Sequence, residues 1–105
     1  MEIIWSPLAM KSLISILDYI RLQFGDCIAE KTYNLIISRI ELLSSFPQIG
    51  KSDNRFNQAN ADIRFIICKK SLIYYIIKEQ KIIIVLVWDS RKDPRELIQM
   101  LSLPI

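Results

Sequence analysis

The sequence predicts an α+β domain with the order β-α-α-β-β-β-α: an N-terminal strand, a helical hairpin, a three-stranded antiparallel meander and a short C-terminal helix. Two stretches in the first half carry apolar residues at three- and four-residue spacing, which is typical of amphipathic helices. Three runs in the second half are rich in β-branched and aromatic residues, and only short polar connectors separate them. The 105 residues suit one core, so we assign residues 1–105 to a single domain.

Two helices are expected to follow the first strand directly. Ser6 is suited to cap the first helix and Pro7 to occupy its first position. Gly25 can adopt the left-handed conformation that ends a helix, and Asp26 is expected to cap the second one. Because only one or two residues connect the helices, residues 7–46 are predicted to form an antiparallel hairpin.

A long loop is predicted before the meander. Residues 47–61 are polar and aperiodic, and their length is at the upper end for a loop in a compact domain. The runs that follow are almost continuously apolar, a pattern typical of strands covered on both faces. The helical hairpin covers one face, so we expect a partner or a second copy of the chain to cover the other. The predicted strands span residues 2–5, 63–68, 72–78 and 82–88.

The chain is predicted to end in a short helix. Asp93 can cap it, Pro94 suits its first position, and Leu97 belongs to its apolar face.

Composition excludes several classes of site. The chain has no histidine, so Ser-His and Cys-His catalysis are excluded and the commonest metal ligand is missing. Cys27 and Cys68 lack metal-ligand spacing and are expected to be free thiols in a reducing cytoplasm. The longest apolar run, residues 82–88, is too short to span a bilayer, and we find no export signal. We therefore expect a cytoplasmic protein with no metal, no cofactor and no membrane partner.

Basic residues are concentrated in the second half of the chain. Residues 1–50 carry four Lys and Arg against five Asp and Glu, whereas residues 51–105 carry ten against six. The net charge is thus −1 in the first part and +4 in the second. A basic surface of this size suits an acidic protein partner or a nucleic acid, or serves only for solubility.

Six short strings lie at or near the predicted element boundaries. They are Ile4-Trp5-Ser6-Pro7-Leu8-Ala9, Ala29-Glu30-Lys31, Leu43-Ser44-Ser45-Phe46-Pro47-Gln48-Ile49-Gly50, Ile63-Arg64, Leu72-Ile73-Tyr74-Tyr75-Ile76 and Val87-Trp88-Asp89-Ser90-Arg91-Lys92-Asp93-Pro94. Each string is weak alone, but their order and spacing are specific and cover nearly the whole chain. Together they resemble the RelE/ParE superfamily of bacterial toxins.

This resemblance implies the toxin of a type II toxin–antitoxin module, held by the C-terminal segment of a cognate antitoxin. ParE-like members bind DNA gyrase and poison it without being enzymes. RelE-like members enter the ribosome and cut mRNA as endoribonucleases. A third alternative is an inactive homologue that only binds the antitoxin and represses their operon. The chain is expected to form a homodimer or a heterotetramer with the antitoxin.

The residues that RelE-like toxins use for RNA cleavage are depleted in this chain. Arg64 and Arg91 keep two basic positions of that pattern. Ser71 and Ile66 stand where the pattern has an arginine and a lysine, and Leu97 stands where a tyrosine is expected. The missing acid–base groups favour the ParE-like mechanism, in which the toxin inhibits gyrase by binding it.

The candidate site residues differ between the two mechanisms. If the chain is a ribonuclease, the catalytic candidates are Arg64, Arg91 and Asp89. A purely structural alternative pairs Arg64 with Asp89 or Asp93 to fix the C-terminal segment. For a binding toxin, the residues expected to contact the antitoxin or the target are Arg64, Tyr75, Trp88, Arg91, Lys92 and Arg95.

Overall fold

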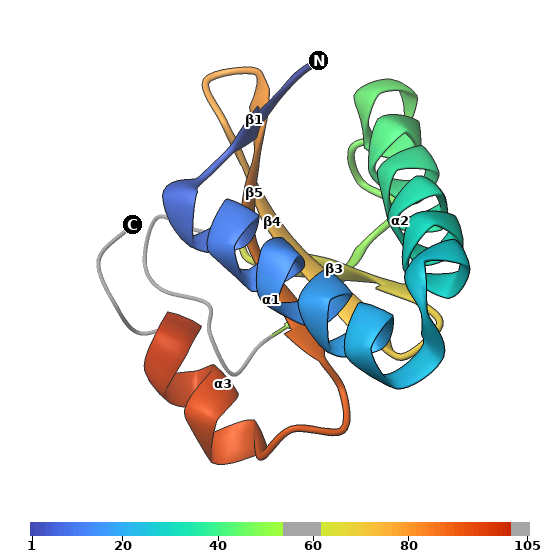
Figure 1. Cartoon of the computed structure of the whole chain (residues 1–105). Helices are drawn as coiled ribbons and strands as arrows, with labels where there is room; N and C mark the ends of the chain where they lie inside the picture. Colours follow the sequence, from blue (N-terminus) through green and yellow to red (C-terminus); the bar gives the residue numbers. More distant parts are fainter. Residues whose placement is uncertain (54–61, 102–105) are drawn as a thin grey trace.

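The computed structural model describes residues 1–53 and 62–101, and its elements confirm the predicted α+β class (Figure 1). The chain opens with a strand and the predicted helical hairpin, and a short strand, the three-stranded meander and a C-terminal helix follow. The elements are β1 (Glu2–Trp5), α1 (Pro7–Phe24), α2 (Asp26–Ser45), β2 (Lys51–Ser52), β3 (Arg64–Cys68), β4 (Ser71–Lys78), β5 (Lys81–Asp89) and α3 (Pro94–Leu101).

The strands form one sheet in the order β1-β5-β4-β3-β2. β3, β4 and β5 make the predicted antiparallel meander, and β1 adds to β5 in parallel. β2 pairs antiparallel with β3. β2 lies inside residues 47–61, which the sequence predicts to be a loop. Only two residues of β2 pair, which leaves no periodic pattern by which to recognise it. Residues 54–61 of that stretch lie outside the described residues.

The hairpin connection corrects one predicted cap. The hydroxyl of Ser6 accepts the Ala9 N–H at 3.0 Å, as expected. Gly25 has a φ of +92° and serves both as the C-cap of α1 and as the N-cap of α2, with no side-chain cap hydrogen bond. Asp26 is therefore not the cap. Because a single residue joins the helices, Asp26 is already the first residue of α2, and it pairs with Arg21 at 3.3 Å.

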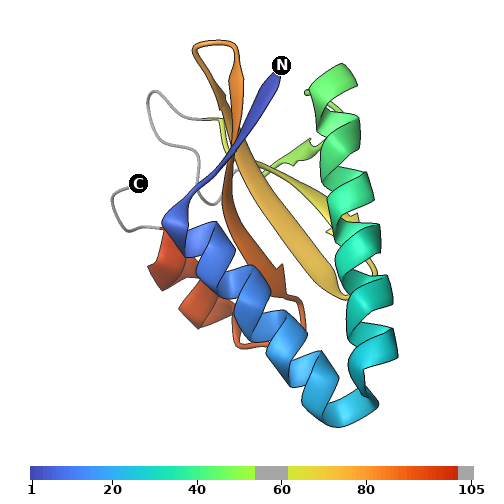
Figure 2. The ribbon, with the colours of Figure 1, turned by 45° about the horizontal axis from the view of Figure 1, so that its top comes forward.

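The two faces of the sheet are covered by different helices (Figure 2). α1 and α2 pack on one face, where Ile36, Tyr75 and Ile84 are fully buried. α3 packs on the other face through Leu97 and Leu101. The expectation that only a partner covers this second face is thus corrected, because the chain covers part of it with its own C-terminal helix. Among the described residues, no helix is long and apolar enough to cross a membrane.

Candidate functional site

The structure separates the predicted site residues into two groups at different ends of the sheet. In the strand register, Arg64 at the start of β3 lies opposite Tyr75 of β4, whereas Asp89 at the end of β5 lies opposite Ser71 of β4. Tyr75 and Ser71 are four residues apart on β4, which is about 13 Å along a strand. The predicted ion pair of Arg64 with Asp89 or Asp93 is therefore wrong. These three residues pair instead with Asp62, Arg91 and Arg95, respectively.

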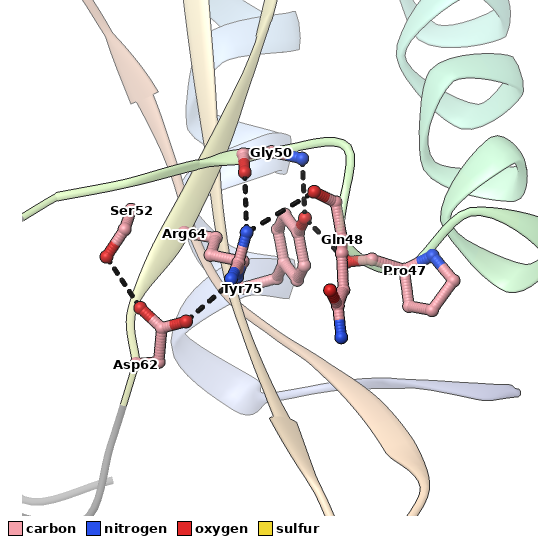
Figure 3. Close-up of polar contacts among 7 residues, drawn as sticks. All are labelled: Pro47, Gln48, Gly50, Ser52, Asp62, Arg64 and Tyr75. Atoms are coloured by element: carbon pink, nitrogen blue, oxygen red, sulfur yellow. Dashed lines mark hydrogen bonds and ion pairs between the residues drawn. The ribbon is translucent and has the colours of Figure 1, made fainter.

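Arg64 is held by the chain itself (Figure 3). Its Nε donates to Oδ2 of Asp62 at 2.9 Å, and its Nη1 donates to the carbonyl oxygens of Gln48 at 3.3 Å and Gly50 at 3.0 Å. The guanidinium thus joins the start of β3 to the segment that leads into β2. An arginine engaged in this way stabilises a loop and has little capacity left for a phosphate.

Tyr75 forms hydrogen bonds to the same segment. Its side chain is fully buried, and its hydroxyl donates to the Pro47 carbonyl at 2.8 Å and accepts the Gly50 N–H at 2.9 Å. Burial raises the pKa of this hydroxyl, so it remains protonated. A Cβ on Gly50 would lie 2.7 Å from Cε1 of Tyr75 and closer still to its hydroxyl oxygen. We call Asp62, Arg64, Tyr75 and residues 47–50 the Arg64 cluster, and its contacts are structural.

Asp89 and Arg91 form a local ion pair after β5. Nε and Nη2 of Arg91 donate to the two carboxylate oxygens of Asp89 at 3.0 and 2.9 Å, and the Arg91 main-chain N–H donates at 2.9 Å. The side-chain hydrogen bonds from Arg91, more than any other cause, lower the pKa of the Asp89 carboxyl. A carboxylate with a lowered pKa is a weak proton acceptor at neutral pH, which counts against Asp89 as a general base.

This ion pair lies beside a cavity of about 220 Å³ between the helical hairpin and the end of the sheet. Lys69, Lys70 and Arg91 supply its cationic lining, and Asp89 is its one carboxylate among the described residues. A neighbouring cavity of about 390 Å³ shares Asp89 and Arg91 and adds Lys92. We call the two cavities the basic cleft. Its apolar wall is formed by Ile16, Ile20, Phe24 and Ile28.

The cleft contains two lysines that the sequence predicts to be a solvated turn and that are not among the predicted site residues. Lys69 and Lys70 form the turn between β3 and β4, and this turn lies beside the end of β5 because Ser71 pairs with Asp89. The short connectors of the predicted meander were the available signal. In a meander of antiparallel strands joined by tight turns, the first turn and the end of the third strand lie at the same end of the sheet.

The remaining predicted residues have different surroundings. Trp88 is buried in the second core cluster, and Lys92 Nζ lies 5.5 Å from its ring centroid. Arg95 is exposed on α3, and its Nη2 pairs with Oδ2 of Asp93 at 2.8 Å. Asp93 also accepts the Arg95 N–H at 2.9 Å, which confirms its predicted capping role. Tyr75 and Trp88 therefore present almost no surface to a partner.

The chemistry of the cleft is that of a binding surface. It combines cations with an apolar wall, and its single carboxylate is already paired. Within residues 1–53 and 62–101, no group of three His, Cys, Asp or Glu side chains could hold a metal ion. The cleft suits an acidic ligand with apolar groups, and it lacks a paired acid and base for proton transfer.

Fold and cleft together define a small α+β protein with a basic cleft that has an apolar wall. The sequence profile described as "ParE toxin of type II toxin-antitoxin system, parDE" matches residues 3–94. The chain therefore belongs to the ParE toxin family of type II toxin–antitoxin systems. A solved structure described as "Chromosomal ParDE TA system from P. aeruginosa" has the same fold, with a TM-score of 0.69 and 19% identity over 83% of this chain and 92% of that chain. No curated protein sequence matches the chain.

Proposed function

We propose that this ParE-family chain is a cytoplasmic toxin that inhibits growth by binding DNA gyrase and that a cognate antitoxin neutralises it. The gyrase target is what the resemblance to ParE-like members implies. The proposal assigns no catalytic residue to the chain, so inhibition depends on the affinity of one surface for its target.

The observation that carries this proposal is the engagement of both arginines retained from the RNA-cleaving pattern. Arg64 is bonded to Asp62 and to two loop carbonyls, and Arg91 is bonded to Asp89. Ser71 is buried where a third cation is expected, and Leu97 is buried in the second core cluster where a tyrosine is expected. RNA cleavage needs a proton donor and a proton acceptor as well as cations, and none of these four positions supplies that acid–base pair.

The basic cleft is the surface that we assign to the target. Arg91 and Lys92 line it, and Arg95 follows on the exposed side of α3. We assign Arg64, Tyr75 and Trp88 indirect roles, because their contacts hold the loop and the core that shape the surface. Removing cations from the cleft should weaken binding to an acidic target without unfolding the chain.

A DNA supercoiling assay with purified gyrase tests the target and the surface together. The unaltered toxin at micromolar concentration should inhibit supercoiling or trap cleaved DNA. The double variant Arg91→Ala and Lys92→Ala should need about tenfold more toxin for the same inhibition, because two cleft cations are lost. Lys78→Ala with Lys81→Ala is the matched control, since it removes the same charge at the opposite end of β4 and β5.

Three results would contradict the proposal. Gyrase that remains fully active with micromolar toxin excludes it as the target. New cuts in translated mRNA after induction of the toxin, mapped by primer extension, would instead assign the chain to the ribonucleases. Harmless expression without any antitoxin would favour the inactive homologue.

Exposed apolar side chains support the antitoxin part of the proposal. Leu22 is 85% exposed and Phe24 60% exposed at the end of α1, and Met10 and Ile14 are more than half exposed on the same helix. The isolated chain should therefore be poorly soluble or dimeric, and co-expression with the small reading frame beside its gene should make it soluble. A soluble monomer in the absence of any partner would contradict this expectation.

A further inference from the structure

Three polar side chains form a row across one end of the sheet, on the face that the helical hairpin covers. Cys68 of β3 lies opposite Ser71 of β4, and Ser71 lies opposite Asp89 of β5. Residues opposite each other on neighbouring strands face the same side of a sheet. Ser71 shares its side with Ile73, which belongs to the core cluster under the hairpin, as Cys68 does. The row therefore faces the helices.

A cavity of about 220 Å³ lies over this row, and its floor contains a buried hydroxyl without a hydrogen-bond partner. Ser71 is 7% exposed, and its hydroxyl forms no hydrogen bond within residues 1–53 and 62–101. No fully enclosed polar side-chain atom of the described residues lacks a partner, so this hydroxyl opens into the cavity that Ser71 lines. Buried polar groups normally form hydrogen bonds, and an unused hydroxyl that faces a cavity therefore indicates a ligand.

The thiol beside this hydroxyl adds no charge to the cavity floor. Cys68 is 2% exposed and lines the same cavity. Burial, more than any other cause, raises the pKa of its thiol, so the thiol remains neutral at physiological pH. The floor next to Ser71 can thus accept an uncharged or a negatively charged group.

The rest of the lining is apolar on the side of the helices and cationic at the turn between β3 and β4. Lys69 and Lys70 form that turn, and neither has a carboxylate partner in the part of the chain that the structure describes. Asp89 is already bonded to Arg91 through both of its carboxylate oxygens. An anion beside Ser71 would therefore meet an excess of positive charge. The apolar wall consists of Ile16, Ile20, Phe24 and Ile28.

Volume and lining together favour one class of ligand. A dry cavity of about 150 Å³ in a protein core holds benzene, so this larger cavity suits an apolar body of about six to eight carbon atoms. Such a body would cover part of Phe24, which is 60% exposed although it lines the cavity. Water alone would leave that apolar wall hydrated, which is unfavourable.

We propose that this cavity binds a small amphipathic carboxylate, with its apolar body under the hairpin and its carboxylate beside Ser71, Lys69 and Lys70. The Ser71 hydroxyl donates to the carboxylate, and the two lysines neutralise it. The cavity is the inner part of the basic cleft, and Cys68 and Ser71 are buried beneath the cations of its surface. This site goes beyond the proposed action on gyrase and does not depend on it.

Octanoate is the probe, and isothermal titration calorimetry measures its binding to the intact chain. Its Kd should be below about 1 mM. Butanoate has the same head group with a shorter body, and octanamide has the same body without the charge. Each should bind at least about tenfold more weakly, because one loses apolar burial and the other loses its charge-assisted contacts.

Variants of the chain locate the binding site. Ser71→Leu fills the cavity and should abolish octanoate binding, and Ser71→Ala removes only the hydroxyl and should weaken binding several-fold. Lys69→Gln with Lys70→Gln should weaken binding about tenfold. Lys78→Gln with Lys81→Gln is the matched control, because it removes the same charge at the opposite end of β4 and β5, and it should leave binding unchanged. Circular dichroism checks that each variant is folded, and the lysine variants keep the test valid if Ser71→Leu does not fold.

The proposal is overturned if octanoate does not bind, or if butanoate or octanamide binds equally well. It is also overturned if folded Ser71→Leu still binds octanoate, because the ligand then lies elsewhere, for example on the exposed Leu22 of α1. Equal losses of affinity in the two double-lysine variants would show that only net charge matters. Binding is measured without gyrase, so its failure is distinguishable from failure of the proposed target.

Discussion

Arg64 and Arg91 differ in what surrounds them, although both match the same basic pattern in sequence. Arg64 bonds to carbonyl oxygens of a segment 14 and 16 residues away, and so it connects two parts of the fold. Arg91 bonds to a carboxylate two residues away and opens onto a cleft. A charged residue bonded across the fold contributes to stability, whereas one paired within its own turn remains available to a partner.

The Arg64 cluster and the basic cleft also differ in the balance of positive and negative groups. Arg64 has the Asp62 carboxylate and two carbonyl oxygens around it. In the basic cleft, four cations surround the single Asp89 carboxylate: Lys69, Lys70, Arg91 and Lys92. Part of the basic excess of the second half of the sequence thus lies at one end of the sheet. Changes in the Arg64 cluster are therefore expected to alter stability, and changes in the basic cleft are expected to alter binding.

The largest effect on stability is expected from Gly50→Ala. The added Cβ would overlap the Tyr75 ring and displace its hydroxyl from the Pro47 carbonyl. Overpacking and the lost hydrogen bonds should together cost about 3 kcal/mol. Thermal denaturation should show a Tm lower by roughly 12–24 °C. The same change should cost less when combined with Tyr75→Phe, because the nearest atom is then gone. A Tm within two degrees of the unaltered protein would show that the Arg64 cluster is not rigid.

A smaller effect is expected from Arg64→Ala, with Arg91→Ala as its matched comparison. Loss of three hydrogen bonds from Arg64 should cost about 2 kcal/mol and lower the Tm by roughly 8–16 °C. Arg91 is exposed, so its removal should leave the Tm nearly unchanged while it weakens inhibition of the target. If the two variants lowered the Tm equally, Arg64 and Arg91 would contribute equally to stability, which contradicts the expected difference.

The smallest effect on stability is expected from lowering the pH. The pKa of Asp89 is lowered in the folded chain, chiefly by the hydrogen bonds from Arg91. The ionised carboxylate therefore stabilises the fold above the ordinary aspartate pKa of about 4, and this contribution is lost as pH falls through the lower folded value. The stability difference between the unaltered chain and Asp89→Asn, from denaturant titrations, should be constant near neutrality and shrink below about pH 4.

Arg91→Ala is the control for this pH dependence. It keeps the carboxylate but removes the main cause of its lowered pKa. The additional change Asp89→Asn should then have little effect on stability at any pH. If the pH dependence persists without Arg91, another group is responsible for the lowered pKa.

Local signals predicted much of the fold. Ser6 with Pro7 and Asp93 with Pro94 mark helix starts that the structure confirms, because capping depends only on residues a few positions apart. The short connectors of the meander predicted its antiparallel pairing. The cap assigned to Asp26 was wrong, because the connection has a single residue and Gly25 serves both helices.

By itself the sequence determined the order of the helices and meander strands, the absence of histidine chemistry and the resemblance to the toxin superfamily. Only the tertiary structure decided how its arginines are used and where its open surfaces lie. Arg64 donates to carbonyl oxygens of residues 48 and 50, and Lys69 and Arg91 line the same cavity because Ser71 pairs with Asp89. Such contacts depend on packing between distant segments, which local propensity does not encode.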